Sequence, residues 1–154
     1  MTKLTALLLF FYLAILPASA QTDVEAFFQK FVSSLNSYDT KVISHFVNDA
    51  TIIRNVIKSD GTTQSVNLPF NRYSQELLRG LTPARVAGYK NNFSNIQVVK
   101  KDENRYKITA IRTPNRDKTG LACHYIVVRQ KDGSFKIQTE SWDTNHQGFL
   151  KYGM

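Results

Sequence analysis

The hydrophobic residues change their spacing along this chain, and that change constrains the fold more than any other feature. Between Asp23 and Asn36 apolar residues recur at the spacing of one face of an amphipathic helix. From Tyr89 onward they alternate with polar residues, as in strands that bury one face. A chain that begins with helices and ends with consecutive strands is predicted to form an α+β fold, in which an antiparallel sheet packs on helices.

Two helices are predicted near the N-terminus. The first covers Asp23 to Asn36, and Thr22 with Glu25 has the spacing of a capping box at its start. Its buried face is formed by Val24, Phe27, Phe28, Phe31, Val32 and Leu35. Asp39 is expected to cap a shorter second helix that ends at Asn48-Asp49. The buried face of that second helix is formed by Val42, Ile43, Phe46 and Val47.

A hairpin and a third helix are predicted next. Thr51 to Ile57 is rich in β-branched residues, which favours a strand, and Thr63 to Leu68 is its predicted partner. Between them, Ser59-Asp60-Gly61-Thr62 is typical of a tight turn. Pro69 is expected to open the third helix and Gly80 to cap its C-terminal end. The apolar residues of this helix are Phe70, Tyr73, Leu77 and Leu78.

Further strands are predicted in the second half of the chain, each separated from the next by a short polar segment. They cover Phe93 to Lys101, Arg105 to Thr113, Leu121 to Gln130 and Ser134 to Asp143. Strands that follow one another through short turns pair antiparallel with their neighbours. The second half is therefore predicted to form an antiparallel meander.

Residues 1–20 have the three parts of a secretory signal peptide. Lys3 gives a positive start, Leu4 to Leu16 is apolar, and Ala18-Ser19-Ala20 matches the small residues before a cleavage site. The apolar run is shorter than the roughly 20 residues that a membrane-spanning helix needs. We therefore expect cleavage before Gln21, export to the periplasm or out of the cell, and a single domain at 21–154.

The order of these elements, together with several short motifs, resembles the NTF2-like superfamily, in particular its SnoaL-like and steroid-isomerase-like branch. The motifs are Phe28–Leu35, Asn36-Ser37-Tyr38-Asp39, Phe46–Thr51, Tyr125–Arg129, Lys131–Gly133 and Phe135–Trp142. In that superfamily a curved antiparallel sheet wraps around N-terminal helices and forms a cone with a central pocket. The resemblance implies the same α+β cone for nearly all of residues 21–154.

The resemblance also implies where an isomerase of this branch would carry its catalytic groups. The tyrosine that stabilises the oxyanion corresponds to Phe31, which has no hydroxyl group. The general-base aspartate corresponds to Arg54 or the aliphatic residues before it, and a protonated arginine cannot abstract a proton. The second acid of these isomerases, which is protonated, corresponds to a position within His124 to Ile126, where the sequence has no carboxylate. Steroid-isomerase activity is therefore not expected.

A set of polar and aromatic residues is predicted to line the pocket of the cone. It consists of Arg54, Tyr73, Tyr89, Arg112, His124, Glu140 and Trp142. An arginine would hold an anionic group there, and the aromatic rings would contact the apolar body of a ligand. A second interpretation stays open for Glu140 and Trp142. By strand alternation they share a face with Lys136 and Gln138, which is typical of an exposed sheet surface or a dimer interface.

Several classes of site are not indicated by the sequence. The three histidines share no metal-ligand spacing, and Cys123 is the only cysteine, so neither a metal site nor an internal disulfide is expected. The sequence contains no motif of a nucleotide, dinucleotide or serine-hydrolase site, and no cofactor is expected. Lysine and arginine are scattered without a basic run, which argues against nucleic acid as a partner.

Three functional hypotheses follow. The leading one is an exported, non-catalytic binding protein with a small amphipathic or anionic ligand in its pocket and a homodimer through the open sheet face. The net charge of +8, or +7 without Lys3, favours anionic partners, including an acidic protein or a membrane surface. The second hypothesis is a protein–protein module of an envelope or secretion assembly, or an immunity-type inhibitor. The third is an enzyme with another acid–base set, for instance His124, Tyr125 or Glu140.

Overall fold

The structure is a computed structural model that describes residues 18–116 and 119–145. Most of the predicted signal segment, and the end of the chain from residue 146, lie outside the described residues. Within the described ranges, no helix is both long enough and apolar enough to cross a membrane.

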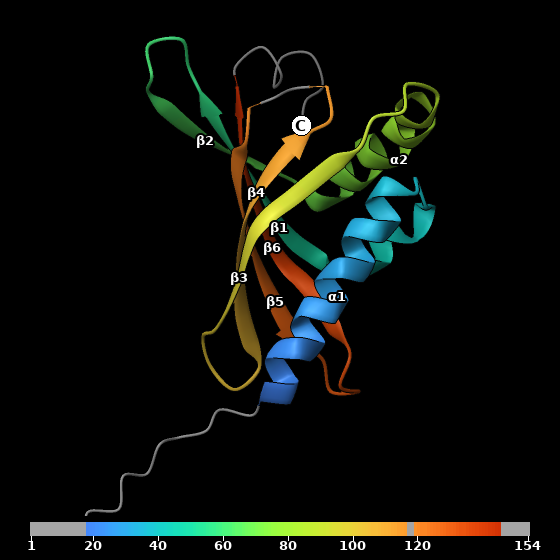
Figure 1. Cartoon of the computed structure of the whole chain (residues 1–154), viewed down its shortest axis with the longest axis vertical. Coiled ribbons are helices and arrows are strands. Elements are labelled where there is room, and N and C mark those ends of the chain that lie inside the picture. The colour runs from blue at the N-terminus through green and yellow to red at the C-terminus, as the bar shows by residue number, and fades with distance from the viewer. Residues whose placement is uncertain (1–17, 117–118, 146–154) are drawn as a thin grey trace, which may run out of the picture.

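The described part of the chain folds into helices and one curved sheet (Figure 1). In chain order the elements are α1 (Ala18–Asn36), the short 3-10 helix η1 (Thr40–His45), β1 (Phe46–Ile57), β2 (Thr63–Leu68), α2 (Phe70–Val86), β3 (Asn91–Lys100), β4 (Arg105–Pro114), β5 (Leu121–Arg129) and β6 (Phe135–Asn145). The strands form a six-stranded sheet with the order β2-β1-β6-β5-β4-β3. Helices α1 and α2 lie against one face of this sheet, which we call the inner face.

The strand pairing confirms the predicted hairpin and meander and adds one pairing that was not predicted. β3 to β6 pair antiparallel in sequence order, and β1 pairs antiparallel with β2 through a turn at Gly61, whose φ is 81°. The added pairing is the parallel one between β1 and β6. It joins the hairpin to the meander in one sheet that curves around the helices. The predicted α+β fold, with a curved sheet wrapped around N-terminal helices, is confirmed.

The ends of the first two helices differ from the prediction. α1 begins at Ala18, so Thr22 and Glu25 lie inside the helix and do not cap its start. Asp39 does cap η1, because its side chain accepts a hydrogen bond from the main-chain nitrogen of Lys41 at 2.9 Å. η1 ends before Phe46, where β1 begins, so the predicted helix end at 48–49 is wrong.

The third helix is longer than predicted. α2 continues through Gly80 to Val86, and the prediction of Gly80 as its cap is wrong. The glycine that follows the helix is Gly88, whose φ of 61° lies in the left-handed region that favours glycine. The main-chain nitrogen of Tyr89 returns to the oxygen of Ala84 at 2.9 Å and closes the last turn.

Aromatic side chains fill much of the space between the helices and the inner face. Phe28 and Phe31 of α1 are buried, and their ring centroids lie 5.0 Å and 5.7 Å from that of Tyr125 on β5. On its other side, the Phe31 ring contacts Phe46 at the start of β1 at 5.7 Å. Edge-to-face contacts of this kind add to the free energy of burying the rings. The helices are thus held on the sheet by rings from both layers.

Candidate functional site

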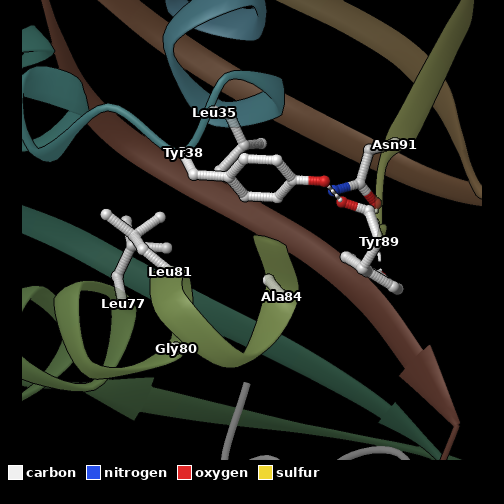
Figure 2. A pocket seen from close by; sticks show the side chains of 8 residues that line it. All are labelled: Leu35, Tyr38, Leu77, Gly80, Leu81, Ala84, Tyr89 and Asn91. Atoms are coloured by element: carbon white, nitrogen blue, oxygen red, sulfur yellow. Dashed lines mark hydrogen bonds between the residues drawn. The ribbon is translucent and has the colours of Figure 1, made fainter. Parts of the chain in front are cut away.

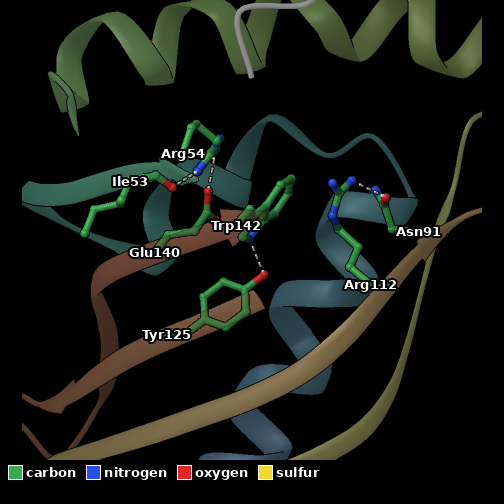
Figure 3. Close-up of polar contacts among 7 residues, drawn as sticks. All are labelled: Ile53, Arg54, Asn91, Arg112, Tyr125, Glu140 and Trp142. Atoms are coloured by element: carbon green, nitrogen blue, oxygen red, sulfur yellow. Dashed lines mark hydrogen bonds and ion pairs between the residues drawn. The ribbon is translucent and has the colours of Figure 1, made fainter. Parts of the chain in front are cut away.

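Polar and aromatic side chains meet in the middle of the inner face, and we call this group the inner cluster; Figure 3 shows most of it. It comprises the buried residues Arg54, Tyr73, Arg112, Tyr125, Glu140 and Trp142. The strand register brings the sheet residues together, because Arg54 of β1 is opposite Trp142 of β6. In the same way, Tyr125 of β5 is opposite Glu140 of β6. Tyr73 reaches the cluster from α2, with its ring centroid 5.2 Å from the guanidinium carbon of Arg54.

A β-bulge at Gln138 decides which side chains of β6 face inward. Ile126 of β5 pairs with Thr139. The next residue of β5, Val127, pairs with Ile137, so Gln138 is an extra residue in β6. An extra residue of this kind interrupts the strict alternation of side chains between the two faces of a strand.

The bulge corrects one prediction from the sequence. Ile137 lies before the bulge and is buried, and Glu140 and Trp142 lie after it and are buried as well. Strict alternation would place Ile137 on the opposite face from the other two. The interpretation that Glu140 and Trp142 lie on an exposed or interfacial face with Lys136 and Gln138 is therefore wrong, because both are enclosed within the single chain.

Arg54 and Glu140 form an ion pair that is entirely enclosed by protein. Nη2 of Arg54 donates to Oε1 of Glu140 at 2.8 Å, and both side chains are 0% exposed. Nη1 of Arg54 donates to the main-chain oxygen of Ile53 at 3.0 Å. Burial by itself would lower the pKa of Arg54, but Glu140, through its charge and its hydrogen bond, and the nearby Tyr73 and Tyr125 together outweigh burial, and the pKa is raised above its ordinary value. The charge of Arg54 is therefore neutralised inside the protein.

Trp142 lies between the two arginines of the cluster. Its ring centroid is 4.8 Å from the guanidinium carbon of Arg54 and 4.2 Å from that of Arg112. Its indole nitrogen donates to the hydroxyl oxygen of Tyr125 at 2.8 Å. These contacts combine two cation–π interactions with a buried hydrogen bond and fix the plane of the indole ring.

The two tyrosines of the cluster are hydrogen-bond donors at any ordinary pH. Burial raises the pKa of Tyr73 well above its usual value, and the negative charge of Glu140 raises it further. The same two causes, in the same order, raise the pKa of Tyr125. Both phenols therefore keep their protons.

Arg112 differs from Arg54 in its partners. Its Nη1 donates to the amide oxygen of Asn91 at 3.1 Å and lies 3.5 Å from the hydroxyl oxygen of Tyr89. Both acceptors are uncharged. Arg112 is only 7% exposed, yet none of the ion pairs formed among the described residues includes it. Its positive charge is thus buried against neutral groups.

Three further polar atoms of the cluster are buried and have no hydrogen-bond partner within the described ranges. They are Nε of Arg54, Nε of Arg112 and Oε2 of Glu140. Buried polar groups in native proteins nearly always have a partner. The cluster therefore retains both donor and acceptor capacity toward a polar group.

Most of the residues predicted to line the pocket meet in or beside the inner cluster. Arg54, Tyr73, Arg112, Glu140 and Trp142 belong to it, and Tyr89 contacts it through Arg112. His124 does not, because it is opposite Thr109 and Ser141 on the outer face of the sheet.

Sequence reasoning named Tyr125 only as a possible acid–base residue and not in the predicted pocket set, and it missed Asn91. Tyr125 shares its strand face with Cys123 and Val127, and all three are buried, so alternation along β5 was a usable signal. Asn91 is the first residue of β3, and nothing in its sequence context distinguishes it.

The groups of the cluster are suited to binding an anion. Cys123 lies opposite Trp142 in the register, and burial raises the pKa of its thiol to about 12, so it is a poor nucleophile. No group of three metal-ligating side chains occurs within residues 18–116 and 119–145. What the geometry provides is guanidinium donors for an anion next to a flat indole surface.

A small hollow opens next to the cluster, between the end of α1, the middle of α2 and the start of β3 (Figure 2). It has a volume of about 60 Å³ and is lined by Leu35, Tyr38, Leu77, Gly80, Leu81, Ala84, Tyr89 and Asn91. Its wall is mostly apolar. Its polar residues include Tyr89 and Asn91, the two that contact Arg112.

Comparison with known proteins identifies the architecture. An NTF-2 like protein of unknown function from Shewanella oneidensis MR-1 superposes with a TM-score of 0.61, with 10% identity over 81% of this chain and 99% of that one. The chain has the NTF2-like fold. A protein with a cystatin-like fold from Caulobacter vibrioides gives a TM-score of 0.62, with 10% identity over 86% of this chain and 95% of that one. ActVI-ORFA from Streptomyces coelicolor gives 0.54, with 12% identity over 79% of this chain and 95% of that one.

At these identities the likeness shows the fold alone. No family model matches the sequence, and no curated protein is significantly similar to it. The function of this NTF2-like chain has to be argued from its own residues.

Proposed function

We propose that this NTF2-like protein is a non-catalytic binding protein that holds a small anionic or amphipathic ligand beside Arg112 of the inner cluster. The observation that carries the proposal is the contrast between the two buried arginines. Arg54 has Glu140 as a charged partner at 2.8 Å, whereas the hydrogen-bond acceptors of Arg112 within the described ranges are the neutral oxygens of Asn91 and Tyr89.

Physical chemistry favours an anion at this place. A buried charge without a charged partner is unfavourable by several kcal/mol, at an order-of-magnitude level, because the protein interior solvates it poorly. The described cluster contains the two positive charges of Arg54 and Arg112 and the one negative charge of Glu140. One added negative charge at Arg112 would neutralise the cluster.

The aromatic residues support an apolar or flat body for the ligand. The ring of Trp142 contacts Arg112 at 4.2 Å, so an anion held by this guanidinium would lie close to the indole. Tyr89 and Asn91, which contact Arg112, also line the mostly apolar hollow. An amphipathic anion satisfies both surroundings, whereas a fully polar one leaves the apolar wall in contact with charge.

The proposal can be tested directly because the chain contains a single tryptophan, Trp142, in the cluster itself. We would titrate the purified protein with the sodium salts of butanoate, octanoate, benzoate and phosphate and follow tryptophan emission and calorimetric heat. We expect saturable binding of at least one of these anions. Arg112→Gln should weaken that binding by at least about tenfold, since a charge-assisted hydrogen bond is lost.

Arg79→Gln is the matched control, since Arg79 on α2 is exposed and forms an ion pair with the exposed Glu76. The Arg79→Gln variant should bind the anions with the same affinity as the unchanged protein. Native mass spectrometry of the same preparation, before and after denaturation, would reveal a ligand that was retained during purification. The proposal is wrong if none of the anions binds, or if Arg112→Gln binds them as well as the unchanged protein.

The proposal includes export and cleavage before Gln21. α1 already begins at Ala18, so this cleavage removes its first residues and leaves Thr22 and Glu25 at the new helix start. In that position the two residues have the spacing of a capping box, which would stabilise the shortened helix. The mass of the protein recovered from the periplasm or culture medium would check this point.

A homodimer through the outer face of the sheet is a second candidate property. Ile53, Ile111 and Ile126 lie on that face and are only partly buried in the single chain. Ile111 and Ile126 are on the neighbouring strands β4 and β5, and Ile53 is on β1, which β6 separates from β5. A contiguous patch of partly exposed aliphatic residues is typical of a surface that another protein covers. Ile126→Lys would then shift the protein toward the monomer in analytical ultracentrifugation and leave anion binding unchanged.

A further inference from the structure

Two side chains join the end of α1 to the start of β3. Asn36, the last residue of α1, donates from Nδ2 to the main-chain oxygen of Asn91 at 2.8 Å. Its Oδ1 accepts a hydrogen bond from the main-chain nitrogen of Asn91 at 2.9 Å. Just after the helix, the hydroxyl group of Tyr38 donates to the main-chain oxygen of Tyr89 at 2.8 Å. Each of these side chains therefore holds the main chain of one residue at or just before the start of β3.

The two residues that are held in this way are the acceptors of Arg112 within the described ranges. Oδ1 of Asn91 accepts from Nη1 of Arg112 at 3.1 Å, and the hydroxyl oxygen of Tyr89 lies 3.5 Å from the same nitrogen. A guanidinium group is planar, and its donors point in fixed directions. The positions of Asn91 and Tyr89 therefore set the direction in which the other donors of Arg112 point.

The position of Asn91 depends on Asn36 because the sheet holds it weakly. β3 is an edge strand, so Asn91 has a strand neighbour on one side only. Its partner in the register is Pro114, whose main chain has no N–H group to donate. Both the N–H and the C=O of Asn91 bond to the side chain of Asn36. Without this side chain, the main chain at Asn91 would lose both of these hydrogen bonds.

Tyr38 has a main-chain conformation that is unfavourable for a tyrosine. Its φ of 60° lies in the left-handed region, which glycine usually occupies just after a helix end. Such a conformation persists only where the surrounding structure holds it, and it is frequent at binding sites. Figure 2 shows the hydroxyl end of the Tyr38 ring directed toward Tyr89 and Asn91. The conformation thus brings the hydroxyl group to the acceptor side of Arg112.

We infer that Asn36 and Tyr38 are positioning residues of the anion site. They hold Asn91 and Tyr89, and through these two residues they orient the guanidinium group of Arg112. The inference rests on the proposed function and goes beyond it, because it assigns a role in binding to residues at the end of α1.

A double-mutant cycle tests the role of Asn36. Asn36→Ala, Asn91→Ala and the double variant would be titrated with the same four sodium salts as the unchanged protein. Asn36→Ala should weaken anion binding by about three- to tenfold, which corresponds to the net free energy of one hydrogen bond. In the Asn91→Ala background it should have no further effect, because the side chain that Asn36 positions is absent. A merely structural role would weaken binding by the same factor in both backgrounds.

A second cycle tests the role of Tyr38. Tyr38→Phe keeps the ring and removes only the hydrogen bond to the main-chain oxygen of Tyr89. We expect a smaller effect of about two- to threefold, because the hydroxyl group of Tyr89 is farther from Arg112 than Oδ1 of Asn91 is. In a Tyr89→Phe background, Tyr38→Phe should have no further effect on the affinity.

Ser37→Ala is the matched control for both cycles. Ser37 lies between the two positioning residues, is exposed, and donates to the main-chain oxygen of Ser34 at 3.3 Å. The Ser37→Ala variant should bind the anions with the same affinity as the unchanged protein. Circular dichroism and the thermal midpoint would show that every variant is folded.

The remaining outcomes separate this inference from the proposed function, and each cycle decides the role of its own residue. If a substitution leaves the affinity unchanged while Arg112→Gln weakens binding, that residue does not position the site, and the proposed function stands. The same conclusion follows if the substitution weakens binding by an equal factor in both backgrounds. If no anion binds, the proposed function is wrong and this inference falls with it.

Discussion

The two arginines of the inner cluster occupy similar positions and differ in one respect. Both extend from strands onto the inner face, both are buried, and both contact the ring of Trp142, at 4.8 Å for Arg54 and 4.2 Å for Arg112. Arg54 is paired with the carboxylate of Glu140, whereas Arg112 contacts the neutral side chains of Asn91 and Tyr89.

The difference indicates separate roles for the two halves of the cluster. A buried ion pair with both partners present is part of the folded structure, and removing one partner leaves a buried charge. A buried arginine without an anion already carries that unfavourable term in the free protein. The Arg54 half is therefore expected to matter for stability and the Arg112 half for binding.

The largest effect is expected from Glu140→Gln. This change leaves Arg54 charged and buried without a charged partner, and should lower the free energy of unfolding by about 3–5 kcal/mol. Urea denaturation followed by circular dichroism measures it. The control is Glu76→Gln, which removes the exposed pair with Arg79 and should change stability by less than about 1 kcal/mol. Equal effects of the two changes would contradict a structural role for the Arg54 half.

Replacing both partners of the pair should be less harmful than replacing one. Arg54→Met combined with Glu140→Leu removes both charges together, and apolar replacements of buried pairs are often neutral or stabilising. We expect the double variant to lie within about 2 kcal/mol of the unchanged protein. If the double variant loses more unfolding free energy than Glu140→Gln alone, the pair contributes through its hydrogen bonds and not through charge neutralisation.

Cys123 reports on opening of the cluster. It is buried opposite Trp142, and the burial that raises the pKa of its thiol to about 12 should prevent labelling of the native protein at pH 8. Glu140→Gln should lower the free energy needed to open the cluster, and each 1.4 kcal/mol of this decrease raises the open fraction about tenfold. We therefore expect labelling by iodoacetamide to become at least about tenfold faster. In Arg112→Met, Cys123 should be labelled at nearly the rate of the unchanged protein. If labelling is accelerated equally in both variants, the Arg54 and Arg112 halves of the cluster do not differ in their contribution to stability.

The smallest effect on stability is expected from Arg112→Met. Removing an unneutralised buried charge offsets the loss of its contacts with Asn91 and Trp142, so the free energy of unfolding should change by at most about 1 kcal/mol. The same variant should lose anion binding. A destabilisation as large as that of Glu140→Gln would mean that Arg112 is structural.

Much of the fold could be predicted because its signals are local. The hairpin between β1 and β2 was predicted with the observed bounds of β2, since turn residues and β-branched runs act within a few positions. Helix ends were less predictable. A capping-box spacing at Thr22 and Glu25 also fits inside a helix, and Gly80 is tolerated in the interior of α2.

The candidate site was predicted in its residue types but not in its geometry. Arg54, Arg112 and Trp142 were expected to line a pocket; the structure brings all three together in the buried inner cluster, and Tyr89 is the predicted residue that lines the hollow. The burial of Glu140 and Trp142 on the same face as Ile137 could not be predicted by alternation, because the bulge at Gln138 arises from pairing with β5.

The sequence by itself determined that this chain forms helices followed by antiparallel strands, since hydrophobic period and turn chemistry are properties of neighbouring residues. It also determined which charged and aromatic residues were available for a site. Only the tertiary structure decided that Arg54 meets Glu140, 86 residues away, and that Arg112 meets no carboxylate among the described residues. Those contacts depend on the parallel pairing of β1 with β6 and on a one-residue shift in register, which act between segments far apart in the chain.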